Sequence, residues 1–301
     1  MTQDSSQFLP RETTSRLGKL EIQAKGIVEG FMSGTHRSPY FGQSIEFVQH
    51  RDYVPGDDFR RIDWKVWSKT DKYYIKQYEE ETNLRTVILL DQSESMAFQS
   101  GERSKYEFAS LATAALSYLL LRQQDSVGLA TFTNKLRQAV PIRSHHQHLH
   151  IILNALLEKP GADATDLTQT MTSVAERYSR RGLFVLLSDC FGKLEGLFRG
   201  LERLKLAGHD VMVLQTLDDQ ELDFDFQGTT KFIGMEQGGE ITCDPKSLRE
   251  GYLAALAQHN EKLKRFCTAR SIDFETVRTS QAVDAVLARY LAKRQAMMKA
   301  K

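Results

Sequence analysis

The chain has 301 residues, which is enough for one large α/β domain with an appendage or for two ordinary domains. Its 40 Lys and Arg residues balance 39 Asp and Glu residues, and the net charge of +1 argues against a nucleic-acid binder or an acidic solubilising domain. The cysteines, Cys190, Cys243 and Cys267, are widely spaced and odd in number, which favours a reducing compartment over a disulfide framework. Because no signal peptide or membrane-spanning run is visible either, we expect a cytoplasmic protein without membrane insertion.

Residues 1–83 are predicted to form an N-terminal module made of a helix and a β-rich segment. Apolar residues at helical spacing from Leu17 to Phe31 predict the helix, which should end near Gly34. The stretch that follows is rich in aromatic residues, and the Pro-Gly order in Val54-Pro55-Gly56-Asp57 predicts a type II turn within it. Because so short a segment cannot cover its own aromatic side chains, we expect that residues 34–83 cannot be removed without loss of solubility.

Residues 84–293 are predicted to form an α/β domain in which strands and helices alternate. One helix has a clear start, because Ser104 and Glu107 have the spacing of a capping box. Short links between alternating elements imply right-handed crossovers and a doubly wound, mostly parallel sheet flanked by helices. We expect strands at residues 86–90, 127–132, 136–142, 183–188, 211–217 and 273–277, and helices at residues 104–124, 148–157, 166–178, 194–206, 247–270 and 281–293.

Two segments depart from this alternation. Residues 218–245 alternate Asp and Phe around Gly228 and contain a second turn candidate at Gly238-Gly239, so we expect a short hairpin excursion there. Residues 294–301 form a basic tail without acidic residues. These charges complement the dipole of the closing helix, which we favour over a tail that binds membrane or nucleic acid.

The apolar run at residues 86–90 leads directly into Asp91, Ser93 and Ser95. Ligands of open α/β sheets gather at the carboxyl ends of such strands. Spacing by two in an extended loop can turn three side chains toward one point, and carboxylate and hydroxyl oxygens are donors that Mg²⁺ prefers. The simpler alternative is that these residues cap the helix that follows.

Thr165 and Asp189 are two further oxygen donors in suitable places. Asp189 ends the apolar strand at residues 183–188, so a parallel sheet would put it at the same edge as Asp91. Thr165 lies in a loop just ahead of a helix, where it could also serve as an N-cap. Together the two acids and three hydroxyls match the donor set of an octahedral Mg²⁺ site with one open position.

The pattern Asp91-x-Ser93-x-Ser95, with Thr165 and Asp189, resembles the metal-ion-dependent adhesion site of von Willebrand factor A domains. The resemblance covers roughly residues 84–293. It implies that the hydroxyls surround one Mg²⁺, or Mn²⁺, that the acids act directly or through water, and that an acidic residue of a partner protein completes the coordination.

The segment before this domain also resembles the signature of the bacterial family called domain of unknown function 58, whose members carry such an A-like domain. Ser68-Lys69 departs from that signature, which has a small residue and an arginine there. The charged residues could form a network that pins the module to the sheet domain, or they could form a second binding surface, and we favour the first. The matching residues are Phe47, Arg51, Tyr53, Pro55, Gly56, Asp57, Asp58, Arg60, Ile62, Asp63 and Trp64.

A histidine cluster follows the third predicted strand. His146 and His150 have the i, i+4 spacing of transition-metal ligands, but the sequence places no third ligand beside them. We therefore favour a solvated helix start.

Two functions fit these features. The resemblance implies a non-enzymatic adaptor that grips a partner carboxylate through Mg²⁺, and proteins of this family are associated with MoxR-type AAA+ ATPases. The chain lacks the phosphate-binding Gly-x-x-x-x-Gly-Lys-Ser/Thr motif, so nucleotide hydrolysis would come from such a partner. The alternative is a Mg²⁺-dependent hydrolase or phosphatase, since strand-end aspartates also support phosphoryl transfer. Against it, Ser93 stands where a haloacid-dehalogenase-type enzyme needs a second acid, and no general base or lysine partner is apparent.

Overall fold

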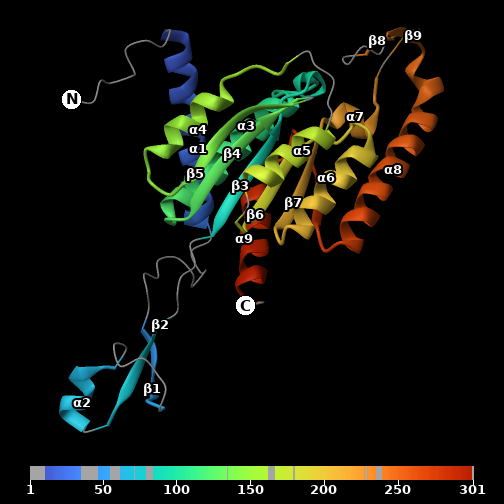
Figure 1. The fold of residues 1–301 in the computed structure, drawn as a ribbon. Coiled ribbons are helices and arrows are strands. Elements are labelled where there is room, and N and C mark those ends of the chain that lie inside the picture. Colours follow the sequence, from blue (N-terminus) through green and yellow to red (C-terminus); the bar gives the residue numbers. More distant parts are fainter. Residues whose placement is uncertain are drawn as a thin grey trace. The chain divides into compact units, whose positions relative to one another are not determined.

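The computed structural model divides the chain into two compact units, residues 1–34 with 84–301 and residues 35–83 (Figure 1). The N-terminal helix, which we grouped with the β-rich segment, therefore belongs to the sheet unit. No helix in the described part of the chain is long and apolar enough to cross a membrane. The structure describes residues 11–34, 47–54, 62–70, 72–78, 84–133, 135–161, 167–178, 180–226, 228, 230–234 and 239–299.

A six-stranded sheet forms the centre of the larger unit, with the order β10-β7-β6-β3-β4-β5. Neighbouring strands are parallel except for β5, which runs antiparallel to β4. The chain adds strands in one direction from β3 to β5 and in the other from β6 to β10, so the topology reverses between β3 and β6. The strands are β3 (Arg85–Asp91), β4 (Ser126–Phe132), β5 (Leu136–Arg143), β6 (Leu183–Ser188), β7 (Asp210–Leu217) and β10 (Asp273–Arg278).

Helices cover both faces of this sheet (Figure 1). Alternate residues of β3 point to opposite faces, so Ile88 and Leu90 lie in one apolar core while Val87 and Leu89 lie in the other. This arrangement confirms the predicted doubly wound, mostly parallel α/β fold. The first core is shared with α1 (Arg11–Gly34), α3 (Lys105–Arg122), α4 (His148–Leu156) and α9 (Asp284–Lys299), and the second with α5 (Leu167–Arg177), α6 (Leu194–Leu206) and α8 (Pro245–Ala269).

The helix α3 is buried on almost every side. The predicted capping box is present, because Ser104 Oγ accepts a hydrogen bond from Glu107 N and the Glu107 carboxylate accepts one from Ser104 N. Helix α1 covers α3, and Ala24 and Val28 of α1 are fully buried in the first core. The helical spacing of α1 identified its apolar face, and the structure identifies α3 as a helix that it covers.

The excursion expected between residues 218 and 245 begins with a short helix, α7 (Asp219–Asp223), which we did not predict. Asp218 caps it, and Glu221 completes a capping box with Asp218. The strands β8 (Thr230–Ile233) and β9 (Glu240–Cys243) follow and pair antiparallel as a hairpin.

The smaller unit contains an antiparallel pair, β1 (Phe47–Asp52) and β2 (Tyr74–Tyr78), and the helix α2 (Trp64–Thr70). Ile62 forms an isolated bridge with Ile75, and both side chains are buried. Asp63, also buried, accepts a hydrogen bond of 3.3 Å from Val66 N and so caps the start of α2.

Candidate metal site

Asp91 ends β3 at the point where the sheet topology reverses, and its side chain is only 1% exposed. Its Oδ1 accepts a hydrogen bond of 2.9 Å from Ser93 N, and its Oδ2 accepts one of 2.6 Å from Ser188 Oγ. The carboxylate is therefore held in place by the loop that follows β3 and by the last residue of β6. In the part of the chain that the structure describes, no cationic side chain pairs with it.

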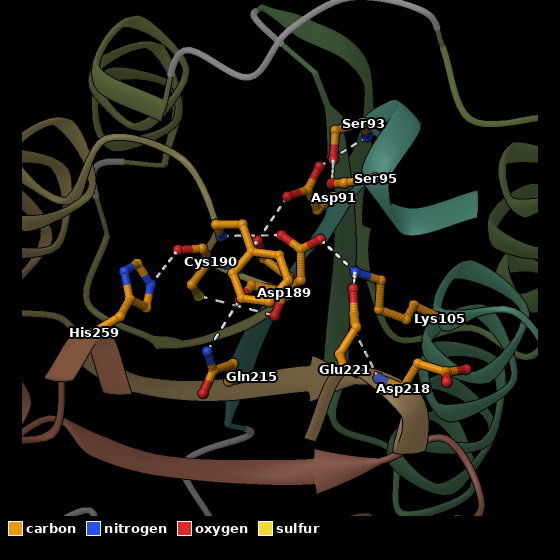
Figure 2. A network of polar contacts seen from close by, with 12 residues as sticks. Asp91, Ser93, Ser95, Lys105, Asp189, Cys190, Gln215, Asp218, Glu221 and His259 are labelled. Atoms are coloured by element: carbon orange, nitrogen blue, oxygen red, sulfur yellow. Dashed lines mark hydrogen bonds and ion pairs between the residues drawn. The ribbon is translucent and has the colours of Figure 1, made fainter. Parts of the chain in front are cut away.

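Ser93 and Ser95 lie beside this carboxylate (Figure 2). Their hydroxyl oxygens are 3.0 Å apart. Ser93 occupies the N-cap position of the short 3₁₀ helix η3 (Glu94–Ala97), but its side chain makes no capping hydrogen bond. The capping alternative therefore does not account for this serine, whose hydroxyl lies next to that of Ser95 instead.

Asp189 follows β6 and is 2% exposed. Its Oδ1 accepts a hydrogen bond of 3.1 Å from Phe191 N. Cys190 has a φ of 59°, which is uncommon for a residue other than glycine, and its carbonyl accepts a hydrogen bond of 2.9 Å from His259 Nε2. Gln215 Nε2 donates to the Asp189 carbonyl at 3.1 Å. The backbone around Asp189 is thus fixed by side chains from two other elements.

The sequence reasoning missed Ser188, which connects the two acids. Its hydroxyl donates to Asp91 and accepts a hydrogen bond of 3.0 Å from Cys190 N. Leu90 and Leu187 are register partners in the sheet, so Asp91 and Ser188 are the next residues of adjacent strands. A hydroxyl immediately before a strand-end acid is the signal that could have identified it.

Lys105 and Glu221 were also missed. The Lys105 ammonium is fully buried, 2.7 Å from Asp189 Oδ2 and 2.6 Å from Glu221 Oε1, and 4.9 Å from the centre of the Phe191 ring. A lysine in the first turn of a helix opposes the helix dipole. This unusual position, directly after the capping residue Ser104, was the available sequence signal.

Burial and neighbouring charges shift the pKa values of three residues at the site. The pKa of Asp91 is raised from 3.8 to about 7, first because burial disfavours its charged form and second because Asp189 is also negative. Burial by itself would lower the pKa of Lys105, but the charges of Asp189 and Glu221 outweigh this and raise it. Burial raises the pKa of Glu221, against the opposing effect of Lys105.

These residues fit a Mg²⁺ ion by the chemistry of their donors. Asp91, Ser93, Ser95 and Asp189 offer only carboxylate and hydroxyl oxygens, and Asp91 is a buried carboxylate without a cation among the described residues. Within the same residues, no group of three His, Cys, Asp or Glu side chains could hold a metal ion, so the site depends on its serine hydroxyls.

Thr165 lies outside the described residues. The last described residue before it is Gly161, whose N–H donates a hydrogen bond of 2.8 Å to the carbonyl of Gln92, the residue after Asp91. The segment that leads to Thr165 therefore starts next to the candidate metal site.

The histidine cluster is divided between the interior and the surface. His148 is buried and its Nε2 is 3.1 Å from the Val127 carbonyl, while His150 is exposed and lies 3.8 Å from Glu21. Burial disfavours the charged form of His148 and therefore lowers its pKa.

The family-signature residues lie in the smaller unit. Arg51 is in β1, and Asp63 caps α2 at Trp64. Trp64, Trp67, Tyr73 and Tyr53 form a chain of ring contacts with centroids about 6 Å apart. Gly56, Asp57, Asp58 and Arg60 lie outside the described residues, as does the predicted turn.

The larger unit has a von Willebrand factor A-like α/β fold, and the small unit is inserted in the sequence after its first helix. The chain belongs to the family described as "Protein of unknown function DUF58", whose model matches residues 49–262. This result confirms the predicted family.

Several proteins and solved structures are similar to this chain. An uncharacterized protein of Mycobacterium tuberculosis is 28% identical over 92% of this chain and 88% of its own length. The uncharacterized protein YeaD of Bacillus subtilis is 29% identical over 35% of this chain and 24% of its own length. Among solved structures, BatB of Bacteroides thetaiotaomicron is 18% identical, with a TM-score of 0.47, over 70% of this chain and 98% of that one. The VWA domain of SpRpn10 is 12% identical, with a TM-score of 0.39, over 69% of this chain and 94% of that one.

Proposed function

We propose that this protein is a non-enzymatic adaptor that binds an acidic residue of a protein partner through a Mg²⁺ ion. One observation carries the proposal. Asp91 is buried at the topological switch point without a cationic partner among the described residues, beside two serine hydroxyls 3.0 Å apart. A divalent cation would neutralise this carboxylate and would find hard oxygen donors around it.

Each residue of the site has a distinct role in this proposal. Asp91, Ser93 and Ser95 would hold the ion, with Asp189 acting directly or through water and Thr165 adding a further hydroxyl. Ser188 and the backbone of Ser93 orient the Asp91 carboxylate. When bound, Mg²⁺ supplies a positive charge and a coordination position for a carboxylate, which fixes the orientation of the partner as well as its affinity.

The alternative of a Mg²⁺-dependent hydrolase gains one feature that the sequence did not reveal, a lysine beside a strand-end acid. The Lys105 ammonium is fully buried, however, and already lies between the carboxylates of Asp189 and Glu221. Ser93 still occupies the position where a second acid would be needed. We therefore retain the binding function as the proposal.

The partner we propose is a MoxR-type AAA+ ATPase or the protein on which it acts. The resemblance to this family implies such a partner, and the sequence lacks a phosphate-binding loop motif of its own. An adaptor of this kind would take part in assembling or remodelling a complex, with the energy supplied by the ATPase.

The test is a pull-down of the ATPase with the full chain, in Mg²⁺ and in chelator. We expect binding that requires Mg²⁺ and that is lost in Asp91→Ala and weakened in Thr165→Ala, while both variants remain folded. Binding that is indifferent to chelator and to both substitutions would contradict a metal-mediated contact and would point to another surface.

A further inference from the structure

The two acids at the edge of the sheet are held in different ways (Figure 2). Both side-chain oxygens of Asp189 are engaged, Oδ1 by the Phe191 N–H at 3.1 Å and Oδ2 by the Lys105 ammonium at 2.7 Å. Among the described residues, the oxygens of Asp91 receive hydrogen bonds from neutral groups, which include Ser93 N and Ser188 Oγ. One acid therefore has a cation supplied by the chain itself, and the other has none among the described residues.

Burial and contacts with Glu221 and Phe191 hold Lys105 in place next to Asp189. Its side chain is fully buried, so water cannot replace a carboxylate partner. Glu221 Oε1 lies 2.6 Å from the ammonium, and the other carboxylate oxygen of Glu221 accepts a hydrogen bond of 2.8 Å from Asp218 N in the capping box of α7. The Phe191 ring, which follows Asp189 in the chain, lies 4.9 Å from the same ammonium.

We infer that Lys105 is a resident counter-ion of Asp189 that competes with the divalent metal for this carboxylate and so lowers the metal affinity of the site. The inference rests on the proposed function, because it presumes that metal binds beside Asp91. A metal ion that binds the Asp189 carboxylate has two options. It must displace the Lys105 ammonium from Oδ2, or it must bind while that ammonium stays 2.7 Å from Oδ2 and repels the metal.

Glu221 gives the ammonium an alternative partner. When a metal ion binds the Asp189 carboxylate, Lys105 keeps its contact with Glu221, so the lysine remains paired inside the protein. Lys105 and Glu221 should therefore affect metal binding in opposite directions. Removing the ammonium frees Asp189 for the metal, whereas removing the charge of Glu221 leaves Asp189 as the only carboxylate close to the ammonium in the described structure.

The experiment is a calorimetric titration of the metal-free full chain with Mg²⁺, repeated with Mn²⁺, for the wild type and three variants. We expect Lys105→Met to raise the affinity by about tenfold or more, because a nearby positive charge is lost. We expect Glu221→Gln to lower it by about threefold or more for the opposite reason. The double variant Lys105→Met/Glu221→Gln replaces the ion pair by two neutral side chains and should bind metal more tightly than the wild type.

The opposite signs separate this role from a structural one. Each single substitution leaves a buried charge without one of its partners, so damage to the fold alone would shift both variants in the same direction. Unchanged affinities, or two shifts of the same sign, in a chain whose wild type binds metal would overturn the inference and leave the proposed function standing. If neither the wild type nor any variant bound metal, the proposed function itself would be wrong.

Discussion

Ser188 Oγ donates a hydrogen bond of 2.6 Å to Asp91 Oδ2 and thereby joins the ends of β6 and β3. The same hydroxyl accepts from Cys190 N, so it ties the loop of Asp189 to the carboxylate of Asp91. The two acids of the candidate metal site, 98 residues apart in the sequence, are thus aligned by one buried serine.

Replacing Ser188 by Ala should weaken metal binding while the fold is retained. The loss of one buried hydrogen bond is worth about 1 kcal/mol, or roughly fivefold in affinity, because Asp91 would no longer be oriented toward the metal. Calorimetric titration with Mn²⁺ measures this. Ser117→Ala is the matched control, because Ser117 is a buried serine of α3 whose hydroxyl has no hydrogen-bond partner within the described structure. Equal affinities for these two variants would contradict the role of Ser188.

The pKa of Asp91 predicts that the metal-free protein loses stability as the pH rises. In the folded protein this pKa is about 7, against an ordinary value of 3.8, so between these values the folded state keeps a proton that the unfolded state has released. The stabilising contribution is complete below pH 3.8 and disappears as the pH passes 7, with an upper limit of roughly 4 kcal/mol.

Unfolding in chelator at a series of pH values from 4 to 8 measures this effect as the difference between the wild type and Asp91→Asn. We expect the wild type to become less stable relative to the variant across this range, and Mg²⁺ to restore its stability most at the high end, where Asp91 is ionised. A difference that does not change with pH would be inconsistent with the raised pKa.

The position of α1 predicts that the sheet unit needs residues 11–34. Val28 is fully buried against the core that contains α3, whereas Ile22 on the same helix is 72% exposed. Val28→Asp should lower the free energy of unfolding by about 3 kcal/mol or more, because it buries an unpaired charge. Ile22→Asp should change it by no more than about 0.5 kcal/mol. Denaturant unfolding compares the two, and similar losses would show that α1 does not pack as described.

Packing of α1 also changes how the small unit should be tested. A chain that begins at residue 84 would lack α1 as well, so its instability would not report on residues 35–83. Deleting residues 35–83 and joining α1 to β3 by a flexible linker isolates that segment. We still expect a loss of solubility, and a fully soluble chain of wild-type stability would refute this prediction.

Asp218, the N-cap of α7, should contribute strongly to the stability of the fold. Its buried carboxylate accepts hydrogen bonds from the backbone and hydroxyl of Ser100, from Gln220 N at 2.9 Å and from Thr279 Oγ1 at 3.3 Å. Asp218→Ala should lower the free energy of unfolding by about 2 kcal/mol, because the buried hydroxyl of Thr279 and the backbone N–H groups of Ser100 and Gln220 lose their acceptor. Asp244, the exposed N-cap of α8, provides the control, because Asp244→Asn should cost less than about 0.5 kcal/mol. Thermal unfolding compares them, and equal losses would contradict this role.

Local patterns were sufficient to predict most elements of the sheet unit. The capping box at Ser104 and Glu107 marked the start of α3, and apolar runs marked the strands. The antiparallel direction of β5 follows from the short link after β4, since a parallel crossover needs about a dozen residues or more. Periodicity did not reveal that α3 is buried on almost every side, because the helix α1 that covers it comes from a distant part of the sequence.

The candidate site was only partly visible for the same reason. Asp91, Ser93 and Ser95 are neighbours in the sequence, and Asp189 could be added because strand ends meet at one edge of a parallel sheet. The pair of Lys105 and Glu221 joins residues 116 apart, and the unusual position of Lys105 in the first turn of α3 does not identify Glu221 as its partner. Whether Thr165 completes the site stays a prediction, since it lies outside the described residues.

The central claim is that Asp91 is the anchor of a metal site, and calorimetric titration of the metal-free chain with Mg²⁺ at pH 8 tests it most directly. The variants to compare are Asp91→Asn and Asp125→Asn. Asp125 is also a buried aspartate, 2% exposed, but it precedes β4 at the opposite edge of the sheet and accepts a hydrogen bond from Leu84 N. We expect one site per chain in the wild type and in Asp125→Asn and none in Asp91→Asn. Undiminished binding in Asp91→Asn would contradict the account.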